Sequence, residues 1–415
     1  MIRRTMVRLP ILFVLLTAPA TLPAQAADSG AFVVTLGTDT VAVERYTRSR
    51  DELRDDMVLR DRSPVITRRL LATLRPDGSV ARLEFDTRAA GGATDAPAMH
   101  GAATFATEET FFEVTRGGET RRASVVTPGG AMPFLNFCYG LYEQIGRRAH
   151  ALGGARVEVP AIWFGASLPF TLTVTFPSPD SMTVGFADQA PTLMDVDAAG
   201  RVLRADGRLT TEKVTVARVP TLDFARLQAS FAPRPLGALS PADSVRVNLA
   251  GASIAIDYSR PARRGRKIFG SLVPWNEVWR TGANAATRFT TSADLLMGGK
   301  TIPRGSYTLW TLPTPTGWKL IINTQTRAPC EGAACILPTR PPLWGTTYTA
   351  DSDLVRLDLT VEQLPQPVEV FTISIDLVGG GGAGTARGGG DGGGGSGVLK
   401  MEWENTRVSI PLTRR

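Results

Sequence analysis

The segment RRLLATLRPDGSVARLEFDTR, residues 68–88, decides how the first half of the chain folds. Apolar and polar residues alternate on both sides of Pro76-Asp77-Gly78, where glycine supplies the positive φ of a tight turn. This pattern is typical of a β-hairpin. The segment LMDVDAAGRVLRADGRL, residues 193–209, repeats it, and two further alternating runs flank the polar turn Thr38-Asp39. The first half is therefore predicted to form an antiparallel, β-rich sheet.

A helix is predicted between Pro133 and Leu152, where apolar residues recur every three or four positions until Gly153-Gly154 ends the pattern. The simplest arrangement is a curved antiparallel sheet, or half-barrel, with this one amphipathic helix on one face. Two interpretations stay open: the helix fills the core, which is the commoner use of an apolar face, or the half-barrel holds an apolar ligand. The apolar positions of the helix are Phe134, Phe137, Cys138, Leu141, Tyr142, Ile145 and Ala149.

Residues 1–26 have the three parts of a secretory signal peptide. Three arginines precede the apolar run LPILFVLL, and Ala24-Gln25-Ala26 has the small residues of a cleavage site. A retained membrane anchor needs a longer apolar run of about 20 residues. We therefore expect a soluble protein, periplasmic or secreted, with no stable membrane span.

The charge of the chain narrows the class of partner. Three of the 46 Lys and Arg residues and none of the 39 Asp and Glu residues lie in residues 1–26. The mature chain therefore has 43 basic and 39 acidic side chains, a formal charge of +4. This small excess, together with export, gives no support for nucleic-acid binding.

Cysteine usage suggests one disulfide and no metal. Cys330 and Cys335 lie in a Gly- and Pro-rich stretch, and an oxidising compartment favours a disulfide between them. A metal site is the alternative, but it would need more ligands than the chain's two histidines, His100 and His150, readily provide. Cys138 lies on the apolar face of the predicted helix and is expected to be a small buried residue. No metal or cofactor is expected.

The length of 415 residues suggests two domains. Residues 220–240 contain Pro, Ala and Gly without strand alternation, so we expect a linker there, between a β-rich domain at 27–219 and a second domain at 241–415. Several runs of the second domain alternate with a period of two, which is typical of an antiparallel β-sandwich. These runs begin at Val245, Ile254, Val355, Phe371, Leu399 and Val408.

A glycine-rich stretch, residues 379–397, interrupts the last hairpin of the second domain. It contains formal matches to the G-x-G-x-x-G dinucleotide pattern and follows a strand. No apolar helical pattern comes after it, however, and almost any register matches in a run of glycines. A disordered loop is the better interpretation, so no nucleotide site is predicted.

The segment from Ile254 to Leu312 combines side chains that often bind ligands. Residues 241–345 contain 13 Lys and Arg against five Asp and Glu, and six of the seven Trp lie between Trp275 and Trp403. Guanidinium groups pair with carboxylate or phosphate, and aromatic faces stack on sugars. These side chains would suit a small anionic or carbohydrate-like ligand, or a cell-envelope component. The alternative is structural, with Trp in the core and buried Arg–Asp pairs holding loops.

The runs IDYSRPARRGRKIFG, VPWNEVWRTGANAAT and IPRGSYTLWTLP of this segment resemble the bacterial family described as domain of unknown function 2911. The resemblance covers about residues 240–412, implies an all-β domain and brings no assigned activity. Its glycines at Gly265, Gly298 and Gly305 suit tight turns. Six other residues have no evident backbone role, and we expect them to converge on one ligand-binding site at an end of the sandwich. They are Arg260, Arg266, Trp279, Arg280, Asn284 and Tyr307.

Two classes of function stay open. The chain has no G-x-S-x-G, H-E-x-x-H, C-x-x-C or P-loop motif, and no catalytic residue stands out, which favours a non-catalytic exported binding protein. The alternative is an extracytoplasmic hydrolase that acts on a glycan or another polar substrate. A glycosidase needs two carboxyl groups about 5–10 Å apart. The segment offers only Asp257, Glu277 and Asp294.

We predict that the chain is cleaved after Ala26 and exported, because residues 1–26 have the composition of a signal peptide. N-terminal sequencing of protein from the periplasm or the medium should begin at Ala27. A variant that lacks residues 2–26 serves as the control and should stay in the cytoplasm. An intact N-terminus at Met1 in the exported fraction would contradict the prediction.

Overall fold

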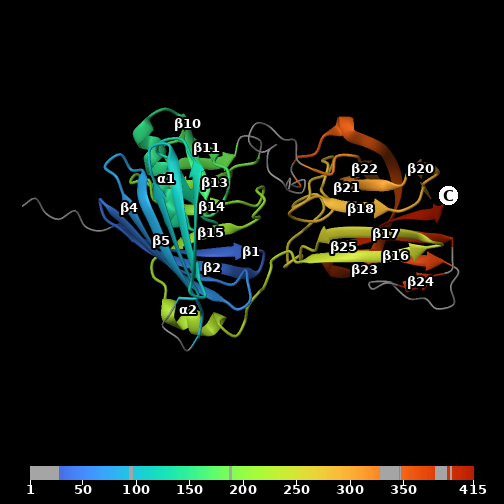
Figure 1. The fold of residues 1–415 in the computed structure, drawn as a ribbon, viewed down its shortest axis with the longest axis horizontal. Coiled ribbons are helices and arrows are strands. Elements are labelled where there is room, and N and C mark those ends of the chain that lie inside the picture. The colour runs from blue at the N-terminus through green and yellow to red at the C-terminus, as the bar shows by residue number, and fades with distance from the viewer. Residues whose placement is uncertain are drawn as a thin grey trace, which may run out of the picture.

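The computed structural model describes residues 28–92, 97–186, 189–327, 345, 347–378, 390–392 and 395–415. The predicted signal peptide, the Cys330–Cys335 pair and most of the glycine-rich stretch lie outside the described residues. None of the helices in the described ranges is long and apolar enough to cross a membrane. The described chain is mainly β and forms two sheets, one from each half (Figure 1).

The first sheet is open and curved, and it runs in the order β8-β7-β6-β5-β4-β3-β2-β1-β15-β14-β13-β12-β11-β10-β9. Neighbouring strands are antiparallel except β9 and β10. This confirms the predicted curved antiparallel sheet. Its strands are β1 (Asp28–Leu36), β2 (Asp39–Arg48), β3 (Glu52–Leu59), β4 (Ile66–Leu74), β5 (Val80–Ala89), β6 (Met99–Phe105), β7 (Glu109–Arg116), β8 (Glu119–Val126), β9 (Met132–Phe134), β10 (Arg156–Trp163), β11 (Phe170–Ser178), β12 (Ser181–Phe186), β13 (Thr192–Val196), β14 (Val202–Asp206) and β15 (Thr215–Val219).

The hairpins that the sequence predicts are present in this sheet. Strands β4 and β5 pair across the turn that contains Gly78, whose φ is 81°, and Leu70 lies opposite Phe85. Strands β13 and β14 pair in the same way across Gly200, whose φ is 71°. Alternate residues point to opposite faces, and one set of each strand is buried in the core of the first half, as Leu70, Met194 and Val202 are.

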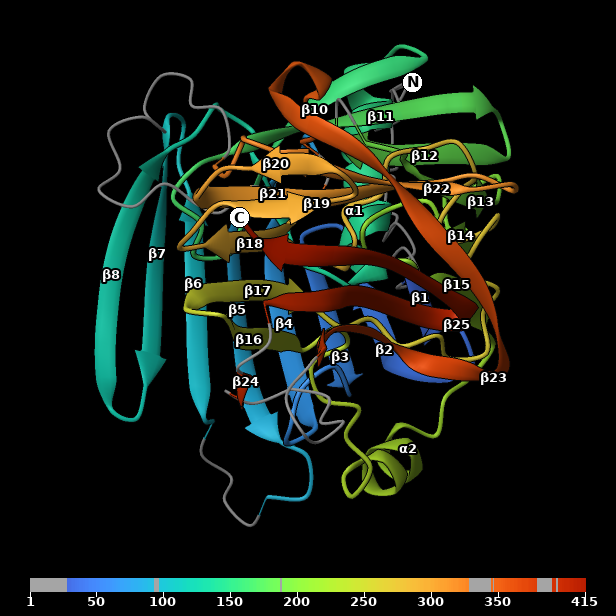
Figure 2. The ribbon, with the colours of Figure 1, turned by 90° about the vertical axis from the view of Figure 1, so that its right-hand side faces the viewer.

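The second sheet has the order β20-β19-β25-β23-β22-β21-β18-β17-β16-β24 and folds onto itself as a sandwich-like unit (Figure 2). The runs that begin at Val355 and Phe371 form one long bent strand, β23, and those at Leu399 and Val408 form another, β25. The strands are β16 (Ala242–Leu249), β17 (Ala252–Ser259), β18 (Thr287–Thr291), β19 (Leu295–Met297), β20 (Lys300–Ile302), β21 (Gly305–Pro313), β22 (Trp318–Asn323), β23 (Asp353–Val378), β24 (Gly390–Gly392) and β25 (Ser396–Arg414), with a 3₁₀ turn at Ala350–Ser352.

The stretch predicted as a linker contains a second helix, α2 (Phe224–Phe231), which the sequence pattern did not predict. Asp223 caps it by accepting from the backbone N–H of Arg226 at 3.0 Å. Both terminal phenylalanines are buried against the convex face of the first sheet. Beyond α2 the chain remains hydrogen-bonded to the first half as far as Leu236, whose N–H donates to the carbonyl oxygen of Arg60 at 2.9 Å.

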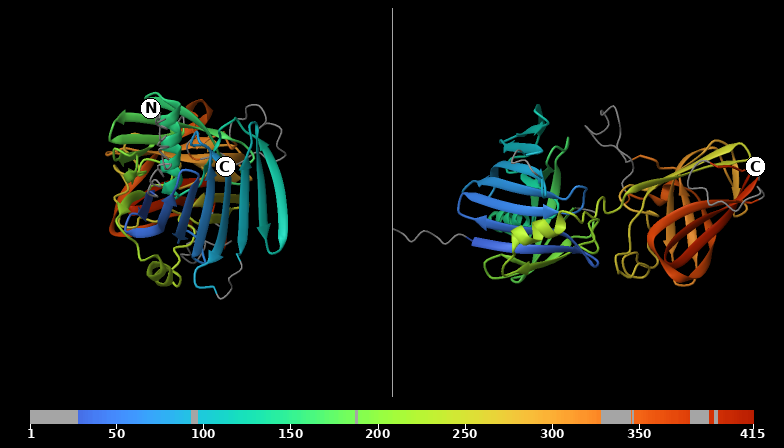
Figure 3. Two further views of the ribbon diagram at one scale, coloured as in Figure 1. Left: turned by 90° about the vertical axis from the view of Figure 1, so that its left-hand side faces the viewer. Right: turned by 90° about the horizontal axis from the view of Figure 1, so that it is seen from below.

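Helix α1 (Tyr139–Leu152) lies within the curve of the first sheet and contacts β2 on one side and β9, β10 and β12 on the other (Figure 3). It begins later than the periodicity predicts, because Pro133 and Phe134 belong to β9. It ends as expected at Gly153 and Gly154, which have φ of 80° and 104°. The helix fills the core of the sheet, as the commoner interpretation holds.

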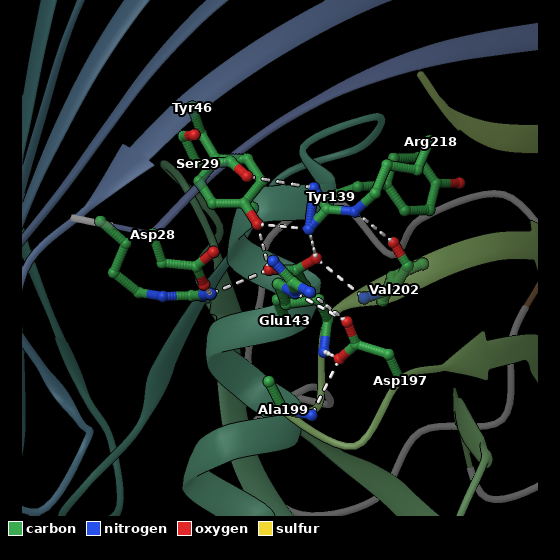
Figure 4. A network of polar contacts seen from close by, with 12 residues as sticks. Asp28, Ser29, Tyr46, Tyr139, Glu143, Asp197, Ala199, Val202 and Arg218 are labelled. Atoms are coloured by element: carbon green, nitrogen blue, oxygen red, sulfur yellow. Dashed lines mark hydrogen bonds and ion pairs between the residues drawn. The ribbon is translucent and has the colours of Figure 1, made fainter. Parts of the chain in front are cut away.

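One buried carboxylate, Glu143, ties α1 to both sides of the sheet (Figure 4). It accepts from the guanidinium groups of Arg48 and Arg218, each at 2.9 Å, and from the backbone N–H of Val202 at 2.8 Å. The hydroxyl of Tyr46 donates to it as well. These partners replace the hydrogen bonds to water that the carboxylate loses on burial. Because several of them are charged, the network holds the helix firmly in position.

Two further buried carboxyl residues, Glu44 and Asp55, lie at the start of α1. They have no cationic hydrogen-bond partner in the described chain. Glu44 accepts from the backbone N–H groups of Tyr139 and Gly140, both at 2.6 Å. Asp55, on the neighbouring strand, accepts from the thiol of Cys138 at 3.2 Å, while its second oxygen has no hydrogen-bond partner in the described chain. Burial raises the pKa of Asp55 to about 6, and burial together with Asp55 raises the pKa of Glu44 well above its usual value.

We predict that Asp55→Asn reduces the pH dependence of stability. The pKa of Asp55 is raised from 3.8 to about 6 on folding, so its contribution is complete below pH 4 and is lost as pH rises through 6. The loss is on the order of a few kcal/mol, since one pKa unit corresponds to about 1.4 kcal/mol. Urea denaturation at pH 4 and pH 7 should show that the difference in unfolding free energy shrinks by about this amount in the variant.

The matched control is Asp56→Asn, because Asp56 points to the opposite face and pairs with Arg45 and Arg69 in solvent. This control should leave most of the pH dependence of the native protein in place. Equal effects of the two substitutions would show that Asp55 is not the titrating group.

Candidate functional site

Two turns hold the two halves of the protein together. The N–H of Thr38 donates to the carbonyl oxygen of Arg264 at 3.0 Å, and the guanidinium group of Arg264 pairs with Asp39. Gly37 and Gly265 have φ of 62° and 72°. A Cβ at Gly37 would lie 2.1 Å from the carbonyl oxygen of Arg264, and one at Gly265 would lie 2.7 Å from Thr38 Cγ2. Only glycine lets the turns approach this closely.

A pocket of about 380 Å³ lies beside this contact and is lined by both halves. Four of the six residues predicted from sequence line it together, and the first half adds residues that the sequence did not indicate. The lining includes Arg266, Trp279, Arg280 and Asn284 from the second half and Asp61, Asn136, Phe137, Glu212 and Lys213 from the first.

The loop that carries Arg280 is strained. Thr281 is buried and has a φ of 54°, which is rare for a β-branched residue, and Asn284 has a φ of 60°. The hydroxyl of Thr287 holds the loop by donating to the carbonyl oxygen of Thr281 at 2.6 Å. Arg280 donates to the carbonyl oxygen of Asn284 at 3.1 Å. The loop therefore presents the Arg280 guanidinium from a fixed backbone.

Trp279 forms a rigid wall of the pocket. Its backbone pairs with Thr311 through hydrogen bonds of 2.8 and 2.9 Å. Its indole stacks on Trp403 with ring centroids 5.8 Å apart and packs edge-on against Phe371. Trp279 therefore belongs to the core of the second half and lines the pocket at the same time.

Three cationic side chains line the pocket without an acidic partner. Arg266 donates only to the carbonyl oxygens of Arg263 and Ala262, at 2.9 and 2.7 Å. Within the described residues, neither Arg266, Arg280 nor Lys213 forms an ion pair with a carboxylate. Burial lowers the pKa of each arginine to about 10. Burial, followed by the two arginines, lowers the pKa of Lys213 to about 8.

Glu212 also lines the pocket, and its charge acts on the buried Tyr139 and Tyr142 of α1 rather than on the three cations. It is partly buried, and across the described ranges its carboxyl group accepts no hydrogen bond. Burial raises its pKa to about 7. The next residue, Lys213, has a φ of 60°, and with Phe137 and Asn284 it is one of three pocket residues among the eight described non-glycine residues with positive φ. Backbone strain of this kind often accumulates at functional sites.

The other two predicted site residues lie outside the pocket. Arg260 donates to the carbonyl oxygen of Phe371 at 3.2 Å and pairs with Asp243 at 3.2 Å, so it fixes β17 to β23. Tyr307 is buried in the core of the second half and donates to the carbonyl oxygen of Pro303 at 2.8 Å. Their chemistry resembles that of ligand-binding residues, but their contacts are internal.

The three carboxylates considered for a hydrolase also lie outside the pocket. Asp257 pairs with Arg246, and both side chains are about half exposed. Asp294 accepts from the backbone N–H of Arg304 at 2.9 Å. Glu277 does not line the pocket, although its charge raises the pKa of Lys213 slightly.

A larger hollow of about 1000 Å³ lies on the convex face of the first sheet. Most of its charged side chains pair with neighbouring charges: Asp56 lies between Arg45 and Arg69, and His100 pairs with Asp86 at 2.9 Å. Charges that are already paired attract a ligand weakly. The smaller pocket, whose cations form no ion pair with any residue that the structure describes, is therefore the stronger candidate.

Sequence reasoning missed Glu212 and Lys213. They lie in TTEKVT, a polar connection before β15 that reads as an ordinary turn. Only the packing of one half against the other brings Lys213 near Arg266 and Arg280 and places Glu212 in the lining of the same pocket, so no local pattern could have indicated them.

Comparisons with known proteins identify the second half only. Residues 240–386 match the family profile described as "Protein of unknown function (DUF2911)", which confirms the resemblance, and the first half matches no profile. No curated protein matches the chain. All six predicted site residues lie within the matched region, whereas Glu212 and Lys213 lie outside it.

Two solved structures are similar to the chain at low identity. One is a DUF1089 family protein from Pseudomonas aeruginosa, with 13% identity and a TM-score of 0.30, covering 40% of this chain and 89% of that one. The other is a "Beta-barrel-like Protein of Domain of Unknown Function DUF1849" from Brucella abortus, with 12% identity and a TM-score of 0.30, covering 46% of this chain and 94% of that one.

We predict that Gly37→Ala separates the two halves, because the new Cβ would lie 2.1 Å from a backbone oxygen of Arg264. Small-angle scattering of the mature protein should show a larger radius of gyration. Gly200→Ala is the matched control, since Gly200 has a φ of 71° but no atom within 4 Å of the added Cβ. The control should cost about 1 kcal/mol of stability without changing the shape. Equal radii for both variants would contradict the prediction.

Proposed function

We propose that this protein is an exported, non-catalytic binding protein that holds a small anionic ligand in the pocket between its two halves. The observation that carries the proposal is the convergence of Lys213, Arg266 and Arg280 on one pocket without an acidic partner in the described chain. Partly buried cations without counter-charges repel one another, which raises the free energy of the empty pocket. A bound anion lowers that free energy. Residues 1–26 support export.

The shape of the pocket limits the size of the ligand. Its volume of about 380 Å³ lies at the lower end of the range for small-molecule sites, about 300–1,000 Å³. Arginine forks recognise carboxylate and phosphate, and the indole of Trp279 offers an apolar wall. A free anion or an acidic sugar of the cell envelope would fit these groups.

A hydrolase is the second candidate, and Glu212 is the observation that favours it. A carboxyl group with a pKa near 7 has the value expected of a general acid. The only other carboxyl group that lines the pocket in the described chain is Asp61, which pairs with Arg62 at 2.8 Å. A glycosidase needs a second free carboxylate, so binding accounts for this arrangement better than hydrolysis does.

We predict that Arg280→Ala weakens anion binding and leaves the fold intact. Calorimetry with inorganic phosphate and glucuronate should show binding to the native protein, with glucose as the uncharged reference. The substitution should weaken it by about 1.5–3 kcal/mol, the range for a charged hydrogen bond. The melting temperature should change little, because the side chain of Arg280 makes its one described hydrogen bond within its own loop.

The matched control is Arg288→Ala, which removes an exposed arginine of β18 that does not line the pocket. It should bind anions as the native protein does. Two results would reject the proposal: no anion binding by the native protein, or a large drop in melting temperature for Arg280→Ala with unchanged affinity.

A further inference from the structure

We propose that a second pocket, in the first half of the protein, binds a hydroxy acid, which is a carboxylate with a hydroxyl group beside it. The pocket has a volume of about 450 Å³ and shares no lining residue with the pocket between the halves. It is lined by the start of β1, by the turns that follow β2, β4 and β13, and by one face of α1. The inference therefore does not depend on the proposed function.

Hydrogen bonds bring the polar side chains of this pocket together. Gln144 and Arg147 are three residues apart on α1, so they lie on the same side of the helix. The amide nitrogen of Gln144 donates to the carbonyl oxygen of Gly78 at 2.8 Å, which fixes the helix to the turn between β4 and β5. Arg147 and Arg48 both donate to Oδ2 of Asp28, so their guanidinium groups lie side by side.

Three polar atoms of these side chains are buried and have no hydrogen-bond partner among the described residues. Two are donors, Nη1 of Arg48 and Nε of Arg147, and the third is an acceptor, Oε1 of Gln144. Arg48 and Gln144 are only 5% and 3% exposed. Because buried polar atoms are normally hydrogen-bonded, three such atoms in the lining of one pocket indicate a ligand that accepts from the arginines and donates to the amide oxygen.

The charge of the lining favours an anion. Five arginines and two aspartates line the pocket. Arg50 and Arg75 form no ion pair in the part of the chain that the structure describes, and Arg75 donates to the main-chain carbonyl oxygen of Val80 at 2.7 Å. Water satisfies buried polar atoms but leaves the positive charge uncompensated. A carboxylate accepts hydrogen bonds from guanidinium groups and compensates their charge as well.

A hydroxy acid meets both requirements with adjacent groups. Its carboxylate accepts from Arg48 and Arg147, and its hydroxyl group donates to the amide oxygen of Gln144. An anion without a hydroxyl group leaves this buried oxygen unsatisfied, which weakens its binding. The protein groups are already held in position, since Arg48 also donates to Glu143 at 2.9 Å and Gln144 donates to Gly78. Little ordering is therefore needed when the ligand binds.

The experiment is calorimetric titration of the full mature protein with malate and succinate at pH 8. Both are dianions of similar size at this pH, and only malate has a hydroxyl group. The native protein should bind malate about three- to tenfold more tightly, the value of one hydrogen bond to a buried acceptor. This comparison needs no substitution, so it does not depend on how a variant folds. In Gln144→Met, which keeps the length of the side chain and removes the acceptor, the ratio should fall to near one.

A second pair of variants tests the arginines. Arg147→Ala should weaken the binding of both dianions about tenfold or more, because a charged hydrogen bond is lost. The melting temperature should change little, since Asp28 keeps its pair with Arg48. The matched control is Arg54→Ala, which removes an exposed arginine that pairs with Glu52 and does not line this pocket. The control should bind both dianions as the native protein does.

The outcomes separate this inference from the proposed function. Equal affinities for malate and succinate in the native protein, or no binding of either, would overturn the hydroxy-acid site. A preference for malate that survives in a folded Gln144→Met would do the same. The Arg280→Ala protein distinguishes the two pockets. It should keep the native preference for malate, whereas a loss of all malate binding in this variant would assign the binding to the pocket between the halves and reject the second site.

Discussion

The contact between the turn at Gly37 and the turn at Arg264 governs the whole candidate site, because neither half forms the pocket by itself. The first half contributes Glu212 and Lys213, and the second contributes a strained loop with Arg280. Two glycines bring the backbones into contact, and the Arg264–Asp39 pair adds charge complementarity. The electrostatic character of the pocket, with three cations that form no ion pair in the described part of the chain, is thus a property of the packed pair of halves.

Much of the fold could be predicted because it follows local rules. Alternation and turn glycines predict the β4–β5 and β13–β14 hairpins, and a helical period predicts α1. The features of the fold that were not predicted also have local causes. Separate alternating runs join into the long strands β23 and β25, since a bend does not interrupt a period of two. Helix α2 was missed although Asp223 and the spacing of Phe224 and Phe231 indicate it, because its composition resembles that of a linker.

The candidate site was only partly predictable for a different reason. Residue type identified Arg266, Trp279, Arg280 and Asn284, which line the pocket, but it selected Arg260 and Tyr307 equally, and these make internal contacts. An arginine that clamps two strands and one that faces a ligand look the same in sequence. The difference lies in which partners the fold supplies, and it appears only when hydrogen bonds and ion pairs can be traced.

The attachment of the chain beyond α2 has a consequence for how firmly the halves associate. Leu236 is hydrogen-bonded to the first half and β16 begins at Ala242, so only residues 237–241 connect the two. Such a tether spans at most about 17 Å. It keeps each turn at an effective concentration in the millimolar range or above relative to the other. Association is then intramolecular and loses little translational entropy, so a contact too weak to join two separate molecules suffices to keep the pocket assembled before any ligand arrives.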